Sequence, residues 1–326
     1  MKRRSFLVFL GGFAAVGPVM AQPSKRPPVV ALVLGVAPLG GMIGADPQIS
    51  FVRTFVHALR DLGWIDGRTV IIERRSAEGA PERAAGIFAE LIGRGVDVIA
   101  VGGERWLQDA ARAATRTIPI VASFRDDPVA AGVIASLARP GGNLTGATFT
   151  TGPEFYGKRL QLLRELAPAA VRIAVLAPSA QLKQLRDITL PAGLTVLPVE
   201  ADVSDQLETA LATILRERAD GLMPDGAGLP FFNTQRLLQF AAENRLPTIY
   251  TARDMAVAGG LISYGGASHW SQLARIVTRF LEGAALGSVP VEQPTKFELV
   301  INLRTARSLG ITVPDALVVR ADMVIE

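Results

Sequence analysis

Residues with the chemistry of catalysis or metal binding are scarce in this chain. Its 326 residues include two histidines, His57 and His269, and no cysteine. The lack of cysteine excludes disulfides, thiolate metal sites and a thiol nucleophile. Two isolated histidines do not provide the histidine and carboxylate spacing of a zinc or iron site. We therefore expect no metal and no cofactor.

Ser268 and His269 are adjacent, which makes a serine nucleophile with a histidine base conceivable. Adjacent residues rarely face each other in the geometry that proton transfer needs. His57 lies in a stretch of helical apolar spacing, so we expect it to be at the surface or half-buried. No catalytic residue is predicted, and we expect that the chain is not an enzyme.

Two glycine-containing stretches have the look of phosphate-binding loops. Gly152, Gly157 and Lys158 have P-loop spacing, but Arg159 stands where a serine or threonine would hold magnesium. We interpret that stretch as a helix start with a basic surface. The glycines from Gly35 onward lack the dinucleotide spacing, so we predict a glycine-rich ligand loop there.

The first residues resemble an export signal. A basic start is followed by an apolar run over residues 6–16 and by compact residues up to Ala21. The run is shorter than the ~20 residues of a membrane-spanning helix, so we favour cleavage after residue 21 over a membrane anchor. Arg3 and Arg4 also fit a twin-arginine signal, although the Sec route stays open. Without a cysteine the product cannot be lipidated, so a free periplasmic protein is expected.

Charge gives no argument for a nucleic-acid partner. The formal net charge of +4 falls to about +1 without the first 21 residues, because they hold three positive and no negative charges. Phosphate backbones require a basic stripe instead. Hydrophobic residues make up 49% and charged residues 20% of the chain, which is a normal globular balance.

Apolar strand-like runs alternate with helical stretches along the chain. Before residue 150, strands are expected at residues 29–36, 69–73, 96–101 and 118–123, with helices at 48–62 and 81–92. The pattern restarts near residue 171, with strands at 172–176, 195–199, 221–223, 247–250 and 261–264 and a helix at 205–216. Continuous apolar strands between helices indicate parallel sheets that are covered on both faces. The fold class is therefore α/β with two doubly wound lobes.

In such sheets ligands bind beyond the carboxyl ends of the strands. Trp106, Phe124, Phe149, Tyr250 and Tyr264 are candidate aromatic walls, although phenylalanines are often core residues instead. Arg105 or Arg125 could pair with a ligand carboxylate, although exposed arginines are common. Asp127 before Pro128 predicts a helix start. The free backbone N–H groups at that helix start, and at the one near Glu104, could donate hydrogen bonds to a ligand carboxylate.

Several longer stretches resemble a known family. They include residues 63–70 (Gly-Trp-Ile-Asp-Gly-Arg-Thr-Val), residues 136–146 with their Ala-Arg-Pro-Gly-Gly-Asn run, and residues 290–303 (Pro-Val-Glu-Gln-Pro-Thr-Lys-Phe-Glu-Leu-Val-Ile-Asn-Leu). These are similar to the ABC-transporter substrate-binding family of the tryptophan/tyrosine type, which has the type I periplasmic binding fold. The similarity covers essentially the whole chain after the signal and is weakest over residues 181–197.

The resemblance implies two lobes joined by a three-segment hinge near residues 145–151, 264–269 and 291–297. The N-terminal lobe would comprise residues 29–147 plus about 268–292, and the C-terminal lobe residues 148–267 plus about 293–326. By matching position, Tyr250, Ser263, Tyr264 and Gly265 carry over as cleft residues, and Phe231 lies in a loop of the family.

The chain departs from the family after the third strand. The family usually has Gly-Thr and small residues there, whereas this chain has Gly102, Gly103, Glu104, Arg105 and Trp106. Loss of the hydroxyl and arrival of bulky groups argue against an ordinary amino-acid ligand.

The resemblance and the cleft candidates together predict a monomeric periplasmic component of an ABC importer. It would capture a small, aromatic or carboxylated solute and deliver it to a permease in the inner membrane. A periplasmic sensor subunit for a membrane receptor would use the same fold and cleft, so that alternative stays open. A hydrolase is disfavoured by the missing nucleophile, base and acid set.

Overall fold

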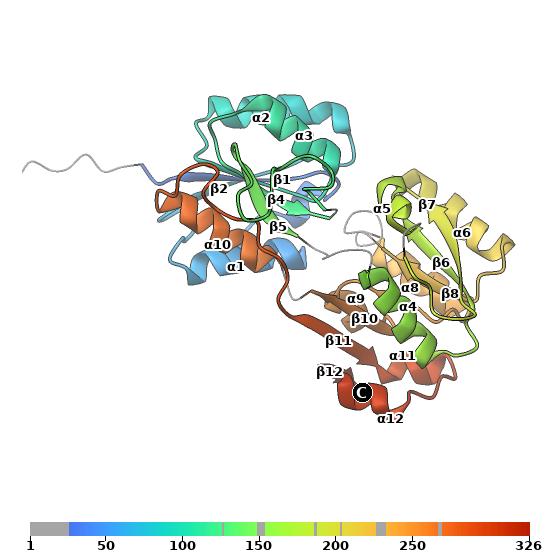
Figure 1. The fold of residues 1–326 in the computed structure, drawn as a ribbon. Helices are drawn as coiled ribbons and strands as arrows, with labels where there is room; N and C mark the ends of the chain where they lie inside the picture. The colour runs from blue at the N-terminus through green and yellow to red at the C-terminus, as the bar shows by residue number, and fades with distance from the viewer. Residues whose placement is uncertain are drawn as a thin grey trace, which may run out of the picture.

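The computed structural model describes residues 26–125, 127–148, 154–185, 188–202, 204–225, 233–266 and 269–326. It contains two α/β bodies, which we call the N-lobe and the C-lobe (Figure 1). The predicted signal, residues 1–21, lies outside the described residues.

The N-lobe is built on a five-stranded sheet with the order β2-β1-β3-β4-β5, and all four pairings are parallel. Its strands are β1 (Val29–Leu34), β2 (Ile71–Ser76), β3 (Val98–Val101), β4 (Ile120–Phe124) and β5 (Leu144–Thr148). Its helices are η1 (Leu39–Gly41), α1 (Ser50–Asp61), η2 (Pro81–Arg83), α2 (Ala84–Gly93), α3 (Arg105–Ala114) and α10 (His269–Leu281).

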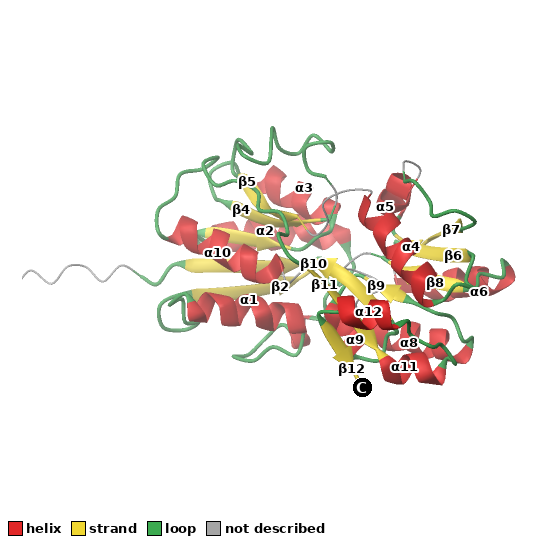
Figure 2. Ribbon diagram, turned by 60° about the horizontal axis from the view of Figure 1, so that its bottom comes forward, coloured by secondary structure: helices red, strands yellow, loops and turns green. Residues whose placement is uncertain are grey.

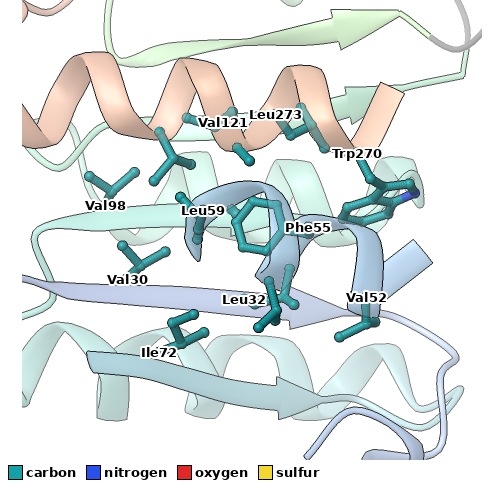
Figure 3. Packing of buried hydrophobic residues seen from close by; sticks show 14 of the residues in the cluster. Val30, Leu32, Val52, Phe55, Leu59, Ile72, Val98, Val121, Trp270 and Leu273 are labelled. Atoms are coloured by element: carbon teal, nitrogen blue, oxygen red, sulfur yellow. The ribbon is translucent and has the colours of Figure 1, made fainter. Parts of the chain in front are cut away.

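Both faces of this sheet are buried, as the continuous apolar strands predict. Val30 and Leu32 of β1 pack in one core with α1 and α10, whereas Ala31 and Val33 pack in a second core with α2 and α3. Figure 3 shows the first core, in which Trp270 at the start of α10 closes the end near Phe55. The indole stacks on Phe51 with ring centroids 4.8 Å apart.

The C-lobe contains a three-stranded sheet, β7-β6-β8, and a four-stranded sheet, β12-β11-β10-β9. A parallel bridge between Leu222 and Thr248 links the two sheets edge to edge. The strands are β6 (Arg172–Ala177), β7 (Thr195–Glu200), β8 (Gly221–Pro224), β9 (Ile249–Tyr250), β10 (Ile262–Gly266), β11 (Phe297–Asn302) and β12 (Met323–Ile325). The helices are α4 (Glu154–Leu166), α5 (Ser179–Gln184), η4 (Ser204–Gln206), α6 (Leu207–Arg216), α8 (Thr234–Glu243), α9 (Arg253–Val257), α11 (Leu303–Ser308) and α12 (Asp315–Arg320).

The chain passes between the lobes three times: from β5 to α4, from β10 to α10, and from α10 to β11 (Figure 1). The third passage explains the one antiparallel pairing among the described strands, which joins β10 and β11. Since β10 runs toward the N-lobe and the chain returns from α10, β11 must begin where β10 ends and run the other way. Helices cover the sheets in both bodies (Figure 2). The two doubly wound lobes of the type I fold are confirmed, with β11 and β12 running antiparallel to β9 and β10.

Two local predictions are corrected by hydrogen bonds between side chains and the backbone. The second strand begins at Ile71, because the Thr69 hydroxyl accepts a hydrogen bond from the Ile65 N–H at 2.7 Å and closes a turn. The helix expected after Asp127 does not form. The Asp127 carboxylate caps the N–H groups of Val129 and Ala130, but the turn ends at Gly132, whose φ is +67°.

Candidate functional site

The carboxyl ends of the N-lobe strands carry a group of glycines and charged side chains. In a parallel sheet these ends share one edge, and here that edge points toward the C-lobe (Figure 1). Gly35 follows β1, Gly102 and Gly103 follow β3, and Arg125 follows β4. Sequence reasoning selected Gly35, Gly103 and Arg125, and the topology brings them to one edge.

The glycines on this edge make room for two charged side chains. A Cβ at Gly35 would lie 2.8 Å from Cγ, Cδ and Oε2 of Glu104, and a Cβ at Gly102 would lie 2.7 Å from the same Oε2. A Cβ at Gly103 would lie 2.7 Å from Nε of Arg125. The carboxylate and the guanidinium therefore lie against the backbone of two successive glycines.

Ser123 and His269 form a buried pair at the same edge. The Ser123 Oγ lies 2.8 Å from the His269 Nε2, although the two residues are 146 positions apart. Burial, with a smaller contribution from the Arg125 charge, lowers the pKa of His269 to about 3. The imidazole is therefore neutral near pH 7 and a very weak base, so the pair ties α10 to β4 rather than activating a nucleophile. Ser268, which the sequence paired with His269, lies outside the described residues.

The other N-lobe candidates pack locally. Arg105 is exposed on α3, where its Nε donates to the Asp109 carboxylate at 3.0 Å. Trp106 is half-buried against the second core, and Phe124 is 2% exposed within it. These two aromatic side chains contribute to the packing of α3 and β4.

The C-lobe candidates lie on two neighbouring strands. Tyr250 of β9 and Ser263 of β10 are register partners, and both are buried. Burial raises the pKa of the Tyr250 phenol to about 12. A Cβ at Gly265 would lie only 1.8 Å from the Thr251 carbonyl oxygen, so only glycine fits this close strand approach.

Tyr264 belongs to an aromatic cluster with Phe155 and Phe297, which we call the aromatic trio. The ring centroid of Phe155 lies 6.0 Å from that of Tyr264 and 4.2 Å from that of Phe297. The trio joins the first turn of α4, the end of β10 and the start of β11, all at the end of the C-lobe where the chain crosses over. Burial raises the pKa of the half-buried Tyr264 phenol, so the ring stays neutral near pH 7.

A buried ion pair supports the trio from behind. Arg159 on α4 is 1% exposed, and its Nη1 lies 3.2 Å from Oδ1 of Asp225 at the end of β8. The Arg159 Nε donates to the Tyr264 carbonyl at 2.9 Å, and the Tyr156 hydroxyl donates to Asp225 Oδ2 at 2.5 Å. The basic surface expected at Arg159 is therefore wrong: the guanidinium is internal and paired. The available sequence signal was an arginine flanked by Leu160 on an apolar helix face.

Two of the predicted site residues are not described by the structure, and the searches for metal sites and membrane-spanning helices cover the described residues. Phe231 and Phe149 lie outside the described residues. Among the residues that are described, no group of three histidine, aspartate or glutamate side chains is placed to hold a metal ion. Within the same part of the chain, no helix combines the length and apolar character needed to cross a bilayer.

Comparison with known proteins gives one consistent result. The sequence profile of the family described as ABC transporter substrate binding protein matches residues 42–325. A tyrosine-binding protein of Clostridioides difficile is 26% identical over 266 residues, which cover 79% of this chain and 75% of that protein.

Solved structures share the fold across nearly the whole chain. An ABC domain from Streptococcus pneumonia in complex with L-Trp superposes with a TM-score of 0.78 at 21% identity, covering 91% of this chain and 99% of that one. A conserved domain protein from Vibrio cholerae gives the same TM-score at 24% identity, covering 92% and 100%. The family and the tyrosine-binding relative are solute-binding proteins and not enzymes, in agreement with the weak base at His269. The chain belongs to the ABC transporter substrate-binding protein family.

Proposed function

We propose that this chain is the exported solute receptor of an ABC importer, which holds a small aromatic, carboxylated solute between its lobes and presents it to a membrane permease. The observation that carries the proposal is the aromatic trio at the end of the C-lobe where the chain crosses over, together with the glycines and Arg125 at the carboxyl ends of the N-lobe strands. Apolar walls with a few aimed polar groups are the usual composition of small-molecule sites.

The two edges supply complementary contacts. Stacking of a ligand ring on Tyr264 would contribute about 0.5–1.5 kcal/mol beyond area burial. Arg125 offers a planar guanidinium for a ligand carboxylate. The relatives that bind tyrosine and L-Trp support an aromatic solute. The ligand site would comprise Gly35, Gly103, Arg125, Ser263, Tyr264 and Gly265, with Phe231 from the neighbouring loop.

Three linked passages between lobes support a hinge mechanism. Closing two rigid bodies around a ligand shifts an open and closed equilibrium by the difference in ligand affinity for the two states. The closed form would be the one that the permease recognises. We also propose export by way of residues 1–21, with a monomeric periplasmic product.

Thermal unfolding with a panel of aromatic amino acids, aromatic acids, branched acids and short peptides tests this function. A true ligand at about 100 times its dissociation constant should add about 2.7 kcal/mol to the free energy of unfolding. Tyr264→Ala should weaken that stabilisation, whereas Tyr264→Phe, which keeps the ring, should preserve it. Absence of any shift across the panel would contradict the proposed solute class. The intact mass of protein recovered from cells shows whether cleavage follows residue 21.

A further inference from the structure

The amino ends of the N-lobe strands carry a row of exposed arginines. All four strand pairings of this sheet are parallel, so these ends share one edge, which points away from the C-lobe (Figure 1). The segments that lead into β2, β1, β4 and β5 each hold one exposed arginine, in that order Arg68, Arg26, Arg116 and Arg139. We call these four residues the arginine row. Neighbouring strands lie about 4.8 Å apart, so the row extends over roughly 20 Å.

Most of the positive charge in the arginine row is not neutralised within the protein. The guanidinium groups of Arg68, Arg116 and Arg139 form no hydrogen bond or ion pair with any residue that the structure describes. Arg26 is partly engaged, because its Nη2 lies 3.7 Å from Oδ1 of Asp97. Free guanidinium groups therefore follow one another along this edge of the sheet.

The acidic residues nearby do not cancel this charge. Oδ2 of Asp97 accepts a hydrogen bond from the Val29 N–H at 2.7 Å, and Oδ2 of Asp66 lies 2.9 Å from Nη2 of Arg74. Glu282, the residue after α10, is an exposed acid at the same end of the lobe, but the free arginines outnumber it. The edge is therefore positive, and such a surface attracts anionic partners.

Apolar side chains lie beside one end of the arginine row. Leu62 and Ile65 follow α1 and are exposed, and Ile71 is exposed at the start of β2. The Ile65 carbonyl accepts a hydrogen bond from the Arg68 N–H at 3.0 Å, so Ile65 and the first arginine share one turn. Trp64 packs partly against the core of α1 and α10. The edge thus combines free positive charge with exposed apolar groups.

An open hollow of about 600 Å³ brings the apolar and the positive groups together. Its lining includes Trp64, Leu281 and two prolines, together with Arg26 and Arg68. Guanidinium groups offer paired donors to phosphate oxygens, and indole rings are enriched at the headgroup level of membranes. This composition fits the headgroup of a phospholipid and the upper part of its acyl chains.

We propose that this edge is a contact site for an anionic lipid bilayer. The negative potential of such a surface attracts the arginine row, and exposed apolar side chains gain from insertion at the interface. A soluble polyanion would engage the arginines alone and would gain nothing from Leu62, Ile65 and Ile71. The candidate ligand edge lies at the other ends of the same strands, so a bilayer-bound protein keeps that edge accessible to solute. The contact does not depend on which solute the protein takes.

Vesicle cosedimentation tests the contact with the chain that lacks its predicted signal, residues 22–326. We expect binding to vesicles that contain phosphatidylglycerol, weak binding to pure phosphatidylcholine, and loss of binding as salt is added. Each arginine should contribute on the order of fivefold to the partition coefficient. Arg68→Gln, Arg116→Gln and Arg139→Gln combined should therefore lower it at least about tenfold. Leu62→Ser combined with Ile65→Ser should lower it as well, because less apolar surface is inserted.

Matched variants change the same chemistry in the C-lobe. Arg218→Gln, Arg245→Gln and Arg307→Gln combined remove three exposed arginines, and Leu215→Ser with Val257→Ser removes two exposed apolar side chains. Both control variants should bind vesicles like the parent.

Melting temperatures check that the variants fold. The triple variant of the arginine row should melt like the parent, because the three side chains have no partner among the described residues. If it melts lower, the single variants Arg68→Gln and Arg116→Gln take its place, each with an expected loss of about fivefold in the partition coefficient.

Two sets of results would overturn the lipid contact. Equal binding to the two kinds of vesicle, or equal losses in the arginine-row variant and its C-lobe control, would show that the edge does not recognise an anionic bilayer. Retention on heparin that falls in the arginine-row variant, with vesicle binding unchanged by Leu62→Ser and Ile65→Ser, would assign the edge to a soluble polyanion instead.

Discussion

The interlobe edges of the two lobes handle buried charge in different ways. In the C-lobe, Arg159 and Asp225 complete each other, and Tyr156 and the Tyr264 carbonyl take up further hydrogen-bonding groups. The C-lobe therefore pairs these two buried charges with each other, although the buried hydroxyls of Tyr250 and Ser263 have no hydrogen-bond partner among the described residues. In the N-lobe, Oε2 of Glu104 is shielded and accepts no hydrogen bond from the residues that the structure describes.

Breaking the buried ion pair between Arg159 and Asp225 should have the largest effect on stability. Arg159→Met leaves Asp225 as a buried, uncompensated charge, and we expect a loss of about 3–5 kcal/mol in the free energy of unfolding. Urea denaturation measures this loss, with Arg307→Met on the exposed surface of α11 as the control.

The paired replacement separates charge from packing. Arg159→Met combined with Asp225→Leu should be less destabilising than Arg159→Met alone, because no unpaired charge remains. A loss below about 1 kcal/mol for the single variant would mean that the ion pair does not hold α4 to β8.

The glycines of the two edges should respond differently to a methyl group. At Gly265 the added Cβ meets the Thr251 carbonyl at 1.8 Å, and relief requires the strands to move. We expect Gly265→Ala to cost about 1–3 kcal/mol or more. At Gly35 the added Cβ meets only the flexible Glu104 side chain, so Gly35→Ala should cost less than about 1 kcal/mol. Equal melting temperatures for the two variants would remove this contrast.

Acidification should destabilise the protein through His269, the buried histidine that joins α10 to β4 of the N-lobe sheet. The pKa of His269 is about 3 in the folded protein, below its ordinary value of 6.5, so the unfolded chain takes up the proton first. Its contribution is fully present above about pH 6.5 and is lost as the pH falls from there toward about 3, by at most about 1.4 kcal/mol per pH unit.

Urea unfolding at about pH 7 and about pH 5 tests this assignment. His269→Gln should lose less stability between these two pH values than the parent, because it lacks the imidazole whose pKa folding lowers. Equal losses in the two proteins would show that folding does not lower the pKa of His269.

How far the sequence predicts the site differs from residue to residue. Gly35, Gly103 and Arg125 were found because loops after apolar strands converge at one edge of a parallel sheet. Tyr264 and Gly265 came from the family resemblance. Arg159 was assigned to a surface, because local spacing does not reveal that Asp225, 66 positions away, ends a strand beside it.

Apolar periodicity, glycine positions and the missing cysteines by themselves determined the α/β class, the two lobes and the scarcity of catalytic groups. These properties depend on local burial patterns and residue chemistry, which a linear sequence contains. Only the tertiary structure decided which charges are paired. Whether Oε2 of Glu104 is shielded, whether Arg159 is internal and whether His269 reaches Ser123 depend on contacts between segments far apart in the chain. Such contacts follow from the packing of sheets and crossovers, which local spacing does not specify.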